Sequence, residues 1–570
     1  MLGLIVVAPL AALVASAALD RGPDGAIRAS IFPTAITVLD PFVGASVRNS
    51  LLMATAVTLA SLLVGISFGR ALGDWRFPLR GLVVAMLTVA AATPTPVIAM
   101  GLAILVDGPG ERAWRGFFDR VGGVDRLAPL DWGWIGWFWA AVAQGGALAS
   151  LSFLSAHARL NPAWRDAARL AGGSRNRVWW RLNWPLLRPA LARPLGFIFA
   201  ATLADPGAPL VLGLRRTLGY QIAAAGLGPE PFPSIAVLGL IVLLLAAIVR
   251  LALFAWSGAD RLERVALADQ RGNARPASAA SSRRTLGAGL LAGAWSVLLA
   301  APVLALVAAM GRAGSLSSME SDGAARGFSG SMAADLAIRS ALLGLAVMVL
   351  AAISRRVVRW LEAAAGSAST DRFERFARLG ASAPLVAGIV ALCVPGLVAM
   401  AAEALGGRSG ALNQLADWLH GGDASFPLLA LGVWLATAPL WLASRDRRDD
   451  SMSAEDPPFA AAALAGAGHG RARRLAMGAS RPARWRSAAL LTTFAATNIA
   501  PAVLLVSSVQ DSTVGPALLF LHERPGDGLA AASALALAVF GLNAAAALAC
   551  RYGGLEGASS VRAKGMARGR

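Results

Sequence analysis

The chain has 570 residues, of which 56% are hydrophobic and 15% are charged, whereas an ordinary soluble domain has roughly 25% charged residues. Together with a mean hydropathy of +0.60, these proportions exclude a water-soluble globular fold. The net charge of +19 would indicate nucleic-acid binding in a soluble protein. Here the arginines lie between apolar blocks, as the positive-inside rule describes for membrane proteins, so we exclude a nucleic-acid partner.

The apolar residues form blocks of about 18–25 residues, each long enough to cross a hydrocarbon core about 30 Å thick as a helix. Hydropathy therefore predicts an all-α polytopic membrane protein with about twelve transmembrane helices. The first block lacks the charged start of a cleaved signal peptide, so it is taken as a span. The predicted spans lie at 2–19, 50–69, 81–106, 133–155, 190–212, 234–256, 286–310, 334–353, 383–405, 426–443, 488–509 and 529–550.

The charge of the loops predicts the orientation of these spans. Alternate loops are rich in arginine, namely 70–80, 159–193, 261–284, 355–378 and 445–486. Because arginine resists translocation, these loops are predicted to face the cytoplasm. An even number of spans then places both termini in the cytoplasm, and the basic tail 551–570 agrees with this. The predicted location is a bacterial inner membrane.

A polar stretch at 257–285 has the small polar residues and charges of a flexible linker. It predicts two tandem halves of about six helices each, 1–256 and 286–570. The third span carries TPTPVIAMGLAIL and the ninth carries CVPGLVAMAAEAL, which fits a parallel duplication. Proline in a span is tolerated where protein or a cavity satisfies the freed backbone groups, so Pro94, Pro96 and Pro395 are predicted to border a translocation path. A purely structural kink is the alternative.

The cytoplasmic loop after the fourth span carries the most information. Pro162 is suited to the first turn of a helix, and the residues up to Ala171 give that helix an apolar surface. Gly172 and Gly173 are predicted to end it. A second, basic segment with three tryptophans then leads through Pro185 into the fifth span. An interfacial helix pair lying on anionic membrane lipid is one interpretation of this composition.

The order of residues in this loop resembles the EAA motif of binding-protein-dependent ABC importer permeases. Asp166, Ala167, Ala168, Gly172 and Pro185 occupy the motif positions in order, with Asp in place of the commoner Glu. The stretches RNSLLMATAVTLASLLVG and LADPGAPLVLGLRRTLGYQI are similar to fused permeases of the ferric-iron and thiamine type. The resemblance implies a type I importer fold, a periplasmic solute-binding protein, and a loop helix that docks on one of two copies of a cytoplasmic ATPase.

The corresponding loop of the second half departs from this motif. It reads FAAAALAGAGHGRARRLAMGASRPARWR, with Ala460 where the acid is expected and Ala479 where the proline is expected. Ala461, Ala462 and Gly466 remain at motif positions, so a helix and turn of the right size are predicted. An asymmetric permease, with a degenerate second loop, follows from this comparison.

The chain has no phosphate-binding loop, because its single lysine, Lys564, lies in RAKGMARGR and not in a glycine-rich loop. ATP is therefore expected to bind to the partner ATPase, and no cofactor is expected in this chain. We interpret Cys393 and Cys550 as small apolar packing residues. The four histidines, His157, His420, His469 and His522, lie singly in predicted loops and suggest no metal site or enzyme.

Two other functions are alternatives to the ABC permease. One is an ion-gradient-driven secondary transporter of about twelve helices, which usually keeps ionisable residues inside the membrane. Candidates here are few: Arg250 near a cytoplasmic end, and Asp205 and Glu403 near outer ends. The other, a membrane-embedded enzyme, lacks a convergent polar cluster. If the chain is a permease, a thiamine-like organic solute and ferric iron are its two candidate substrates.

Overall fold

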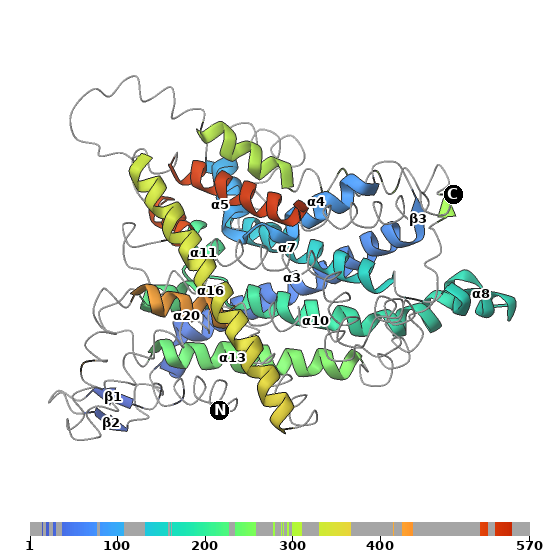
Figure 1. Ribbon diagram of the computed structural model, residues 1–570, viewed down its shortest axis with the longest axis horizontal. Coiled ribbons are helices and arrows are strands. Elements are labelled where there is room, and N and C mark those ends of the chain that lie inside the picture. Colours follow the sequence, from blue (N-terminus) through green and yellow to red (C-terminus); the bar gives the residue numbers. More distant parts are fainter. Residues whose placement is uncertain are drawn as a thin grey trace, which may run out of the picture.

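The structure is a computed structural model, and its described residues form a helical membrane protein (Figure 1). They comprise 37–107 apart from 77–79, 132–226 apart from 158, 159 and 161, 234–257, 299–310, 330–365, 425–436, 513–522, 531–549 and a few short pieces near 14–29, 278–295 and 414. Six helices in this part of the chain are long and apolar enough to cross a membrane, or seven if one bent pair counts as a span.

Most of the described helices belong to the first half of the chain. They are α3 (Pro41–Asp74), α4 (Arg80–Ala92), α5 (Thr95–Asp107), α7 (Trp132–His157), α8 (Pro162–Leu170), α9 (Arg175–Val178), the π-helix η2 (Trp179–Asn183), α10 (Trp184–Leu203), α11 (Gly207–Val211), α12 (Leu218–Gly226) and α13 (Ser234–Ser257). The described residues also include four strands of two or three residues. β1 (Leu19–Arg21) pairs antiparallel with β2 (Ile27–Ala29), and β3 (Trp75–Arg76) pairs parallel with β4 (Ser278–Ala279).

The helices α3 and α7 pack along much of their length because small residues on α3 let the two backbones approach closely. A Cβ atom on Gly65 would lie 2.7 Å from the Cβ of Ala149. One turn further along both helices, a Cβ on Gly69 would overlap the ring of Phe153, and the next turn pairs Gly73 with His157. Residue numbers rise together in these pairs, so α3 and α7 run parallel.

Two parallel helices that follow one another need a connection that returns the chain across the bundle. In the sequence, α4 and α5 lie between α3 and α7. The axes of α4 and α5 meet at an angle of 97° at a short break. The break falls at Thr93 and Pro94, the residues that begin the predicted TPTP kink. The third predicted span therefore exists as a sharply broken span, as the prolines indicated. The fifth predicted span is longer than expected, because it extends from Asn176 to Val211, with a short break between α10 and α11.

In the second half the described helices are α16 (Gly330–Ala365), α20 (Ser425–Ala436) and α26 (Val514–His522), with further helices at Leu299–Met310 and Ala531–Ala549. Parts of the predicted spans 286–310, 334–353, 426–443 and 529–550 are thus helical. The predicted spans 2–19, 383–405 and 488–509 lie almost wholly outside the described residues. The total of about twelve and the division into two halves stay predictions.

One hydrogen bond links a long helix to a later, shorter helix in each half of the chain. In the first half, the backbone N–H of Leu218, at the start of α12, donates to Oγ of Ser50 on α3 at 2.8 Å. In the second half, the N–H of Val514, at the start of α26, donates to Oγ of Ser340 on α16 at 2.9 Å. All four residues are buried. A threonine precedes Leu218 and Val514, and a glycine follows each.

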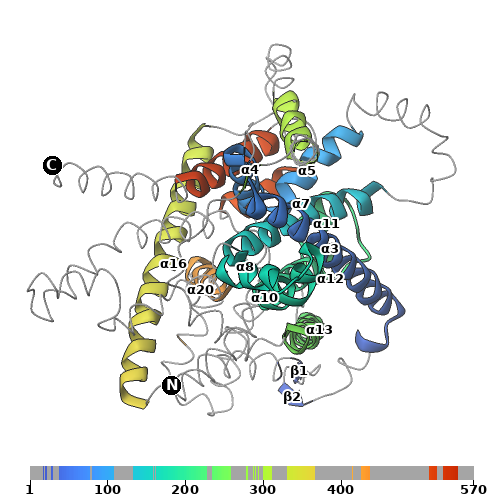
Figure 2. The same cartoon turned by 90° about the vertical axis from the view of Figure 1, so that its right-hand side faces the viewer.

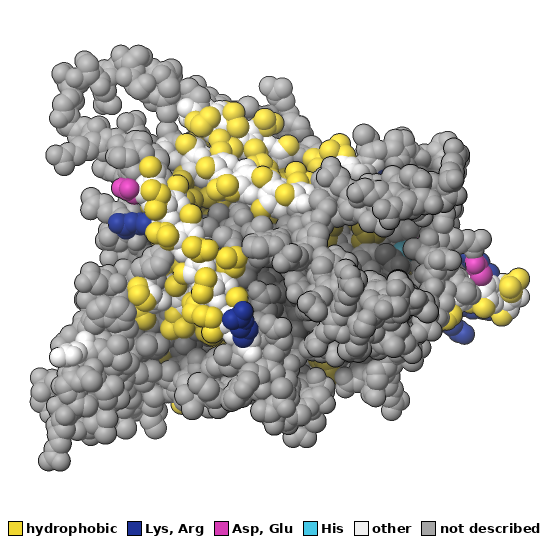
Figure 3. All heavy atoms as spheres, in the orientation of Figure 1, with side chains coloured by type: hydrophobic (Ala, Val, Ile, Leu, Met, Phe, Trp, Pro, Cys, Tyr) yellow, Lys and Arg dark blue, Asp and Glu magenta, His cyan; other side chains and the backbone are white. Residues whose placement is uncertain are grey.

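Large apolar side chains cover the outer surfaces of the long helices, as lipid contact requires. Figure 3 shows a band of hydrophobic side chains that follows the course of α16 across the visible face. The exposed residues on this helix are Ile338, Leu342, Leu345, Val349 and Ile353, which recur at intervals of three to four positions. This surface agrees with the assignment of the chain to membrane proteins.

Candidate functional site

The predicted cytoplasmic loop begins with the nine-residue helix α8, and its end shows why two glycines follow. The N–H of Gly173 donates to the carbonyl of Ala168 at 3.0 Å, and the N–H of Gly172 donates to that of Arg169 at 2.9 Å. This pair of bonds is the Schellman motif, which needs a residue with positive φ. Gly172 has φ of 79° and supplies it. The motif glycine therefore ends the helix, as the sequence predicts.

The helix α8 projects beyond the end of the bundle (Figure 1). In Figure 2 the bundle is seen from this end, with α8 close to α10 near the centre of the view. Leu170, its last residue, is 90% exposed, and Ala167 and Gly172 are exposed as well. Asp166 and Ala168 are partly buried. The motif residues therefore lie on a projecting element whose tip offers an apolar side chain to its surroundings.

The chain returns from α8 to the bundle through a continuous helix. Ser174 caps α9, since its hydroxyl accepts from the N–H of Arg177 at 3.3 Å. The π-helix follows, in which the N–H of Trp184 donates to the carbonyl of Trp179. Pro185 stands in the first turn of α10, directly after these wide turns. A π turn is one way in which a continuous helix accommodates a proline, which lacks the N–H that an α turn would use.

Trp179 fixes the base of this helix against the ends of α3 and α7. Its side chain is 3% exposed, the guanidinium of Arg70 lies 4.5 Å from its ring centroid, and the ring of Phe153 lies 6.1 Å away. Aromatic and cation–π contacts of this kind stabilise by about 0.5–1.5 kcal/mol each. The loop is therefore joined to the bundle by packed rings.

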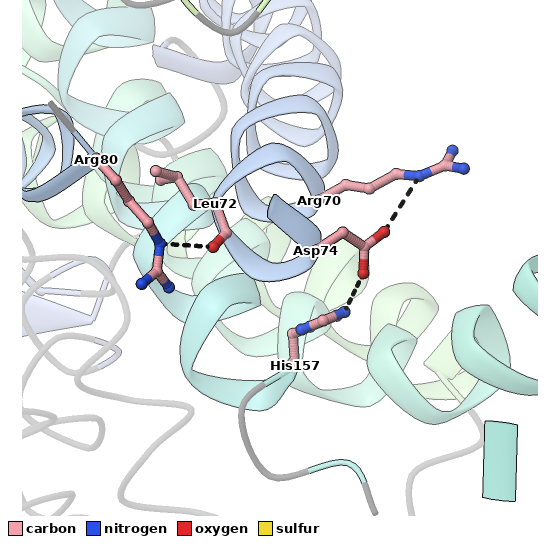
Figure 4. Close-up of polar contacts among 5 residues, drawn as sticks. All are labelled: Arg70, Leu72, Asp74, Arg80 and His157. Atoms are coloured by element: carbon pink, nitrogen blue, oxygen red, sulfur yellow. Dashed lines mark hydrogen bonds and ion pairs between the residues drawn. The ribbon is translucent and has the colours of Figure 1, made fainter. Parts of the chain in front are cut away.

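A polar network completes the base of the loop (Figure 4). Asp74, the last residue of α3, lies with Oδ1 3.1 Å from Nε2 of His157 and Oδ2 3.9 Å from Nε of Arg70. The Nε of Arg80 donates to the carbonyl of Leu72 at 2.9 Å and so caps the end of α3. His157, which we expected to lie singly in a loop, is instead the buried last residue of α7 with an acidic partner. That expectation was wrong because the partner comes from a distant segment.

The prolines predicted to border a translocation path lie at the broken span. Pro94 is partly exposed within the break, and Pro96 is buried in the first turn of α5. Pro96 packs against Gly207 at the start of α11, where an added Cβ would lie 2.5 Å from Cγ of the proline. The carbonyl of Thr93, freed by the break, accepts from Nε2 of Gln144 at 2.9 Å. That these prolines border a translocation path stays a prediction.

Sequence reasoning missed the role of Asp205, which it placed near an outer end. The carboxylate accepts from Oγ1 of Thr95 at 2.9 Å and from the N–H of Gly207 at 3.0 Å. Asp205 thus connects the break between α4 and α5 to the break between α10 and α11. An aspartate followed by Pro-Gly inside an apolar block is a local turn signal that could have indicated a break.

Several predicted residues lie outside the described part of the chain: Ala461, Ala462 and Gly466 of the second loop, and Pro395. In the part that is described, no group of three or more His, Cys, Asp or Glu side chains is arranged to hold a metal ion.

No protein-family model matches the chain, whereas comparison with individual proteins finds relatives. The chain is 27% identical over 225 residues to the ferric transport system permease protein FbpB of Actinobacillus pleuropneumoniae. The matched region covers 37% of this chain and 31% of the relative. The chain is also 28% identical over 187 residues to the molybdate/tungstate transport system permease protein WtpB of Thermococcus kodakarensis. That matched region covers 31% of this chain and 63% of the relative.

Over about a third of its length, the chain is similar to ABC importer permeases. A putative ferric transport permease of Haemophilus influenzae, 25% identical over 226 residues, agrees. The match spans about a third of the length of the ferric permeases and just under two thirds of the molybdate/tungstate permease. The predicted resemblance to ABC importer permeases is thereby confirmed.

Proposed function

We propose that this chain is the permease of an ATP-driven importer whose loop helix α8 docks on a separate cytoplasmic ATPase, which binds the ATP. The observation that carries the proposal is a projecting helix on a fixed base. Leu170 and Ala167 are exposed at the end of the molecule. Trp179, at the other end of the same loop, is buried among side chains of α3 and α7. A displacement of α8 is therefore passed to the bundle through packed side chains.

The proposal includes two tandem permease halves, 1–256 and 286–570, joined by 257–285. The paired hydrogen bonds from Leu218 to Ser50 and from Val514 to Ser340 support it. In each half the start of a short helix docks on a long helix at a serine, and a Thr-x-Gly sequence surrounds the donor. One such chain would work with two ATPase copies and a periplasmic binding protein, in an inner membrane with both termini cytoplasmic.

For the substrate we propose a small inorganic ion delivered by the binding protein. The relatives named above include ferric transport and molybdate/tungstate transport permeases. Ferric iron, one of the two substrates predicted from the sequence, gains support from them, and oxyanions join it as a candidate. A thiamine-like solute stays a prediction without such support.

The docking role is tested by Leu170→Glu. Because this side chain is 90% exposed, the charge should leave the fold intact while it removes an apolar contact from the partner interface. Truncated or blocked anchor residues commonly cost 2 kcal/mol or more of binding, which is roughly 30-fold in affinity. We expect ATPase co-purification with the detergent-solubilised chain to fall by that order.

The matched control is Leu39→Glu, which places the same charge on a side chain that is 77% exposed just before the other end of α3. It should keep the ATPase. Retention of the ATPase by Leu170→Glu would contradict docking through α8. Weaker binding of Leu170→Glu to anionic liposomes, with unchanged ATPase binding, would support a helix that lies on lipid.

A further inference from the structure

Two membrane-spanning segments of the first half are broken, and their breaks meet at one polar joint. The joint consists of Thr93, Pro94 and Thr95 from the first break, and Asp205 and Gly207 from the second. Backbone breaks within a membrane are tolerated only where protein or water satisfies the freed groups. Here side chains satisfy one freed group at each break: Gln144 donates to the Thr93 carbonyl, and the Asp205 carboxylate accepts from Gly207 N–H.

The position of the joint can be read from α7. Gln144 lies near the middle of this 26-residue helix, so the Thr93 break lies near mid-membrane. Asp205 is held beside Thr95, the first residue of α5. Ionisable side chains at such depth are costly in a membrane and are a functional hypothesis by default. Discontinuous helices near the midplane are also where transporters place their solute path.

Asp205 is bound to three elements, which makes it more than a local cap. Its Oδ2 accepts from the hydroxyl of Thr95 on α5, and its Oδ1 accepts from the start of α11. Its backbone carbonyl lies against Gly219 of α12, where an added Cβ would overlap it. A single residue therefore ties α5, α11 and α12 into one unit.

The side chains of the joint are not sealed from their surroundings. Pro94, Thr95, Gln144 and Asp205 are each partly exposed, whereas Thr93, Pro96 and Gly207 beside them are buried. The polar, partly exposed side chains of Thr95, Gln144 and Asp205 fit an aqueous path better than hydrocarbon, because lipid would leave their remaining hydrogen-bonding capacity unsatisfied.

From these contacts we infer that Asp205 is a positioning residue that joins the two broken spans into one moving unit, and that the exposed side of the joint lines the translocation path. The inference rests on the proposed transport function for its meaning. Its test does not depend on the ATPase. When the unit moves, α5, α11 and α12 move together, and the path opens or closes along Pro94 and Asp205.

The first experiment asks whether the joint borders water. In a chain with Cys393 and Cys550 replaced by serine, single cysteines are introduced as Pro94→Cys and, on the apolar face of α3, as Leu63→Cys. The full-length protein in liposomes is treated with a charged methanethiosulfonate reagent. Because only a hydrated thiolate reacts, we expect position 94 to react at least about tenfold faster than position 63. Equal, slow reaction at both positions would overturn the path assignment.

The second experiment asks whether Asp205 holds the unit together. Ala208→Cys places a thiol at a buried position just inside α11, and its reaction is followed in the parent, in Asp205→Ala and in the isosteric Asp205→Asn. We expect Asp205→Ala to raise the labelling rate about tenfold or more, as loss of about 1.4 kcal/mol of closing free energy requires. Asp205→Asn keeps an acceptor for Gly207 and should restore most of the protection.

The matched control is Thr88→Val. The hydroxyl of Thr88 donates within α4, to the carbonyl of Val84 at 2.7 Å. This variant should leave labelling at position 208 unchanged, whereas Thr95→Val should raise it. Unchanged labelling in Asp205→Ala, with the protein still monodisperse, would overturn the positioning role. Because labelling is read without the ATPase, a failure of the docking proposal would appear separately, in the co-purification experiment with Leu170→Glu.

Discussion

The projecting loop and the polar joint use glycine for opposite reasons. At Gly172 an added Cβ would meet nothing within 4 Å, and the residue is needed for its φ of 79°. At Gly219 an added Cβ would overlap the backbone of Asp205, and the residue is needed because it lacks a side chain. The loop is thus conformationally demanding but sterically open, as the proposed docking on an ATPase requires. The joint is sterically closed, as a unit that moves as one body must be.

The largest effect is expected at the joint, with Gly219→Ala. Because the atom in the way is backbone, neighbouring helices must shift, and overpacking of this kind costs about 3 kcal/mol at the upper end of its usual range. The thermal unfolding midpoint of the detergent-solubilised protein should fall clearly. Gly44→Ala, in α3 with nothing within 4 Å of the added atom, should be neutral or slightly stabilising. Equal midpoints for the two variants would show that the joint is not tightly packed.

A smaller effect is expected from the paired serines, and it compares the two halves directly. Ser50→Ala leaves the buried N–H of Leu218 without its acceptor, and Ser340→Ala does the same to Val514. An unsatisfied buried donor costs about 1–3 kcal/mol. If the halves are repeats, the two variants should lose similar stability in chemical or thermal unfolding.

The control for the serine pair is Ser67→Ala, because Ser67 donates only to the carbonyl of Leu63 within its own helix. Its removal should change the free energy of unfolding little. A loss in Ser50→Ala with none in Ser340→Ala would argue that the second half has lost the arrangement as well as its loop motif.

The sequence was sufficient for features that depend on local signals. The end of α8 followed from two adjacent glycines, and the break of the third span followed from Pro94 and Pro96. Apolar blocks located α7 and α13 to within two residues, whereas α3 and α16 extend well beyond their predicted spans. The start of the fifth helix was missed, because helix continues through the amphipathic segment around Trp179 without a break.

Features that depend on contacts between distant segments could not be predicted. His157 gains its partner from Asp74 at the end of another helix, and Asp205 gains Thr95 from a span more than a hundred residues earlier. The stripe of Gly65, Gly69 and Gly73 was visible in the sequence as small residues at every fourth position. Which helix it receives, however, is decided by tertiary packing against Ala149, Phe153 and His157.

A third prediction compares two glycines with the same backbone conformation on different loops. Gly172 and Gly213 both have positive φ, of 79° and 68°, and neither has an atom within 4 Å of an added Cβ. Alanine should therefore cost about 1–2 kcal/mol of local strain at each position. Only Gly172→Ala should reduce ATPase stimulation in proteoliposomes, because only that strain reorients α8. Equal loss of stimulation in Gly213→Ala would mean that the assay reports strain in general and not docking.

The smallest effect is expected at the base of the loop, where Arg70 lies over Trp179. Arg70→Lys keeps the charge near Asp74 but loses the planar group that stacks on the ring, so the loss of stability should be only about 0.5–1 kcal/mol. A double-mutant cycle with Trp179→Phe isolates this contact, since the coupling energy vanishes if the two side chains act independently. A coupling of that size, together with weaker ATPase stimulation in Arg70→Lys, would mean that the contact between Arg70 and Trp179 passes a displacement of α8 to the bundle. Unchanged stimulation would assign transmission to the ring contact between Trp179 and Phe153, which the lysine leaves in place.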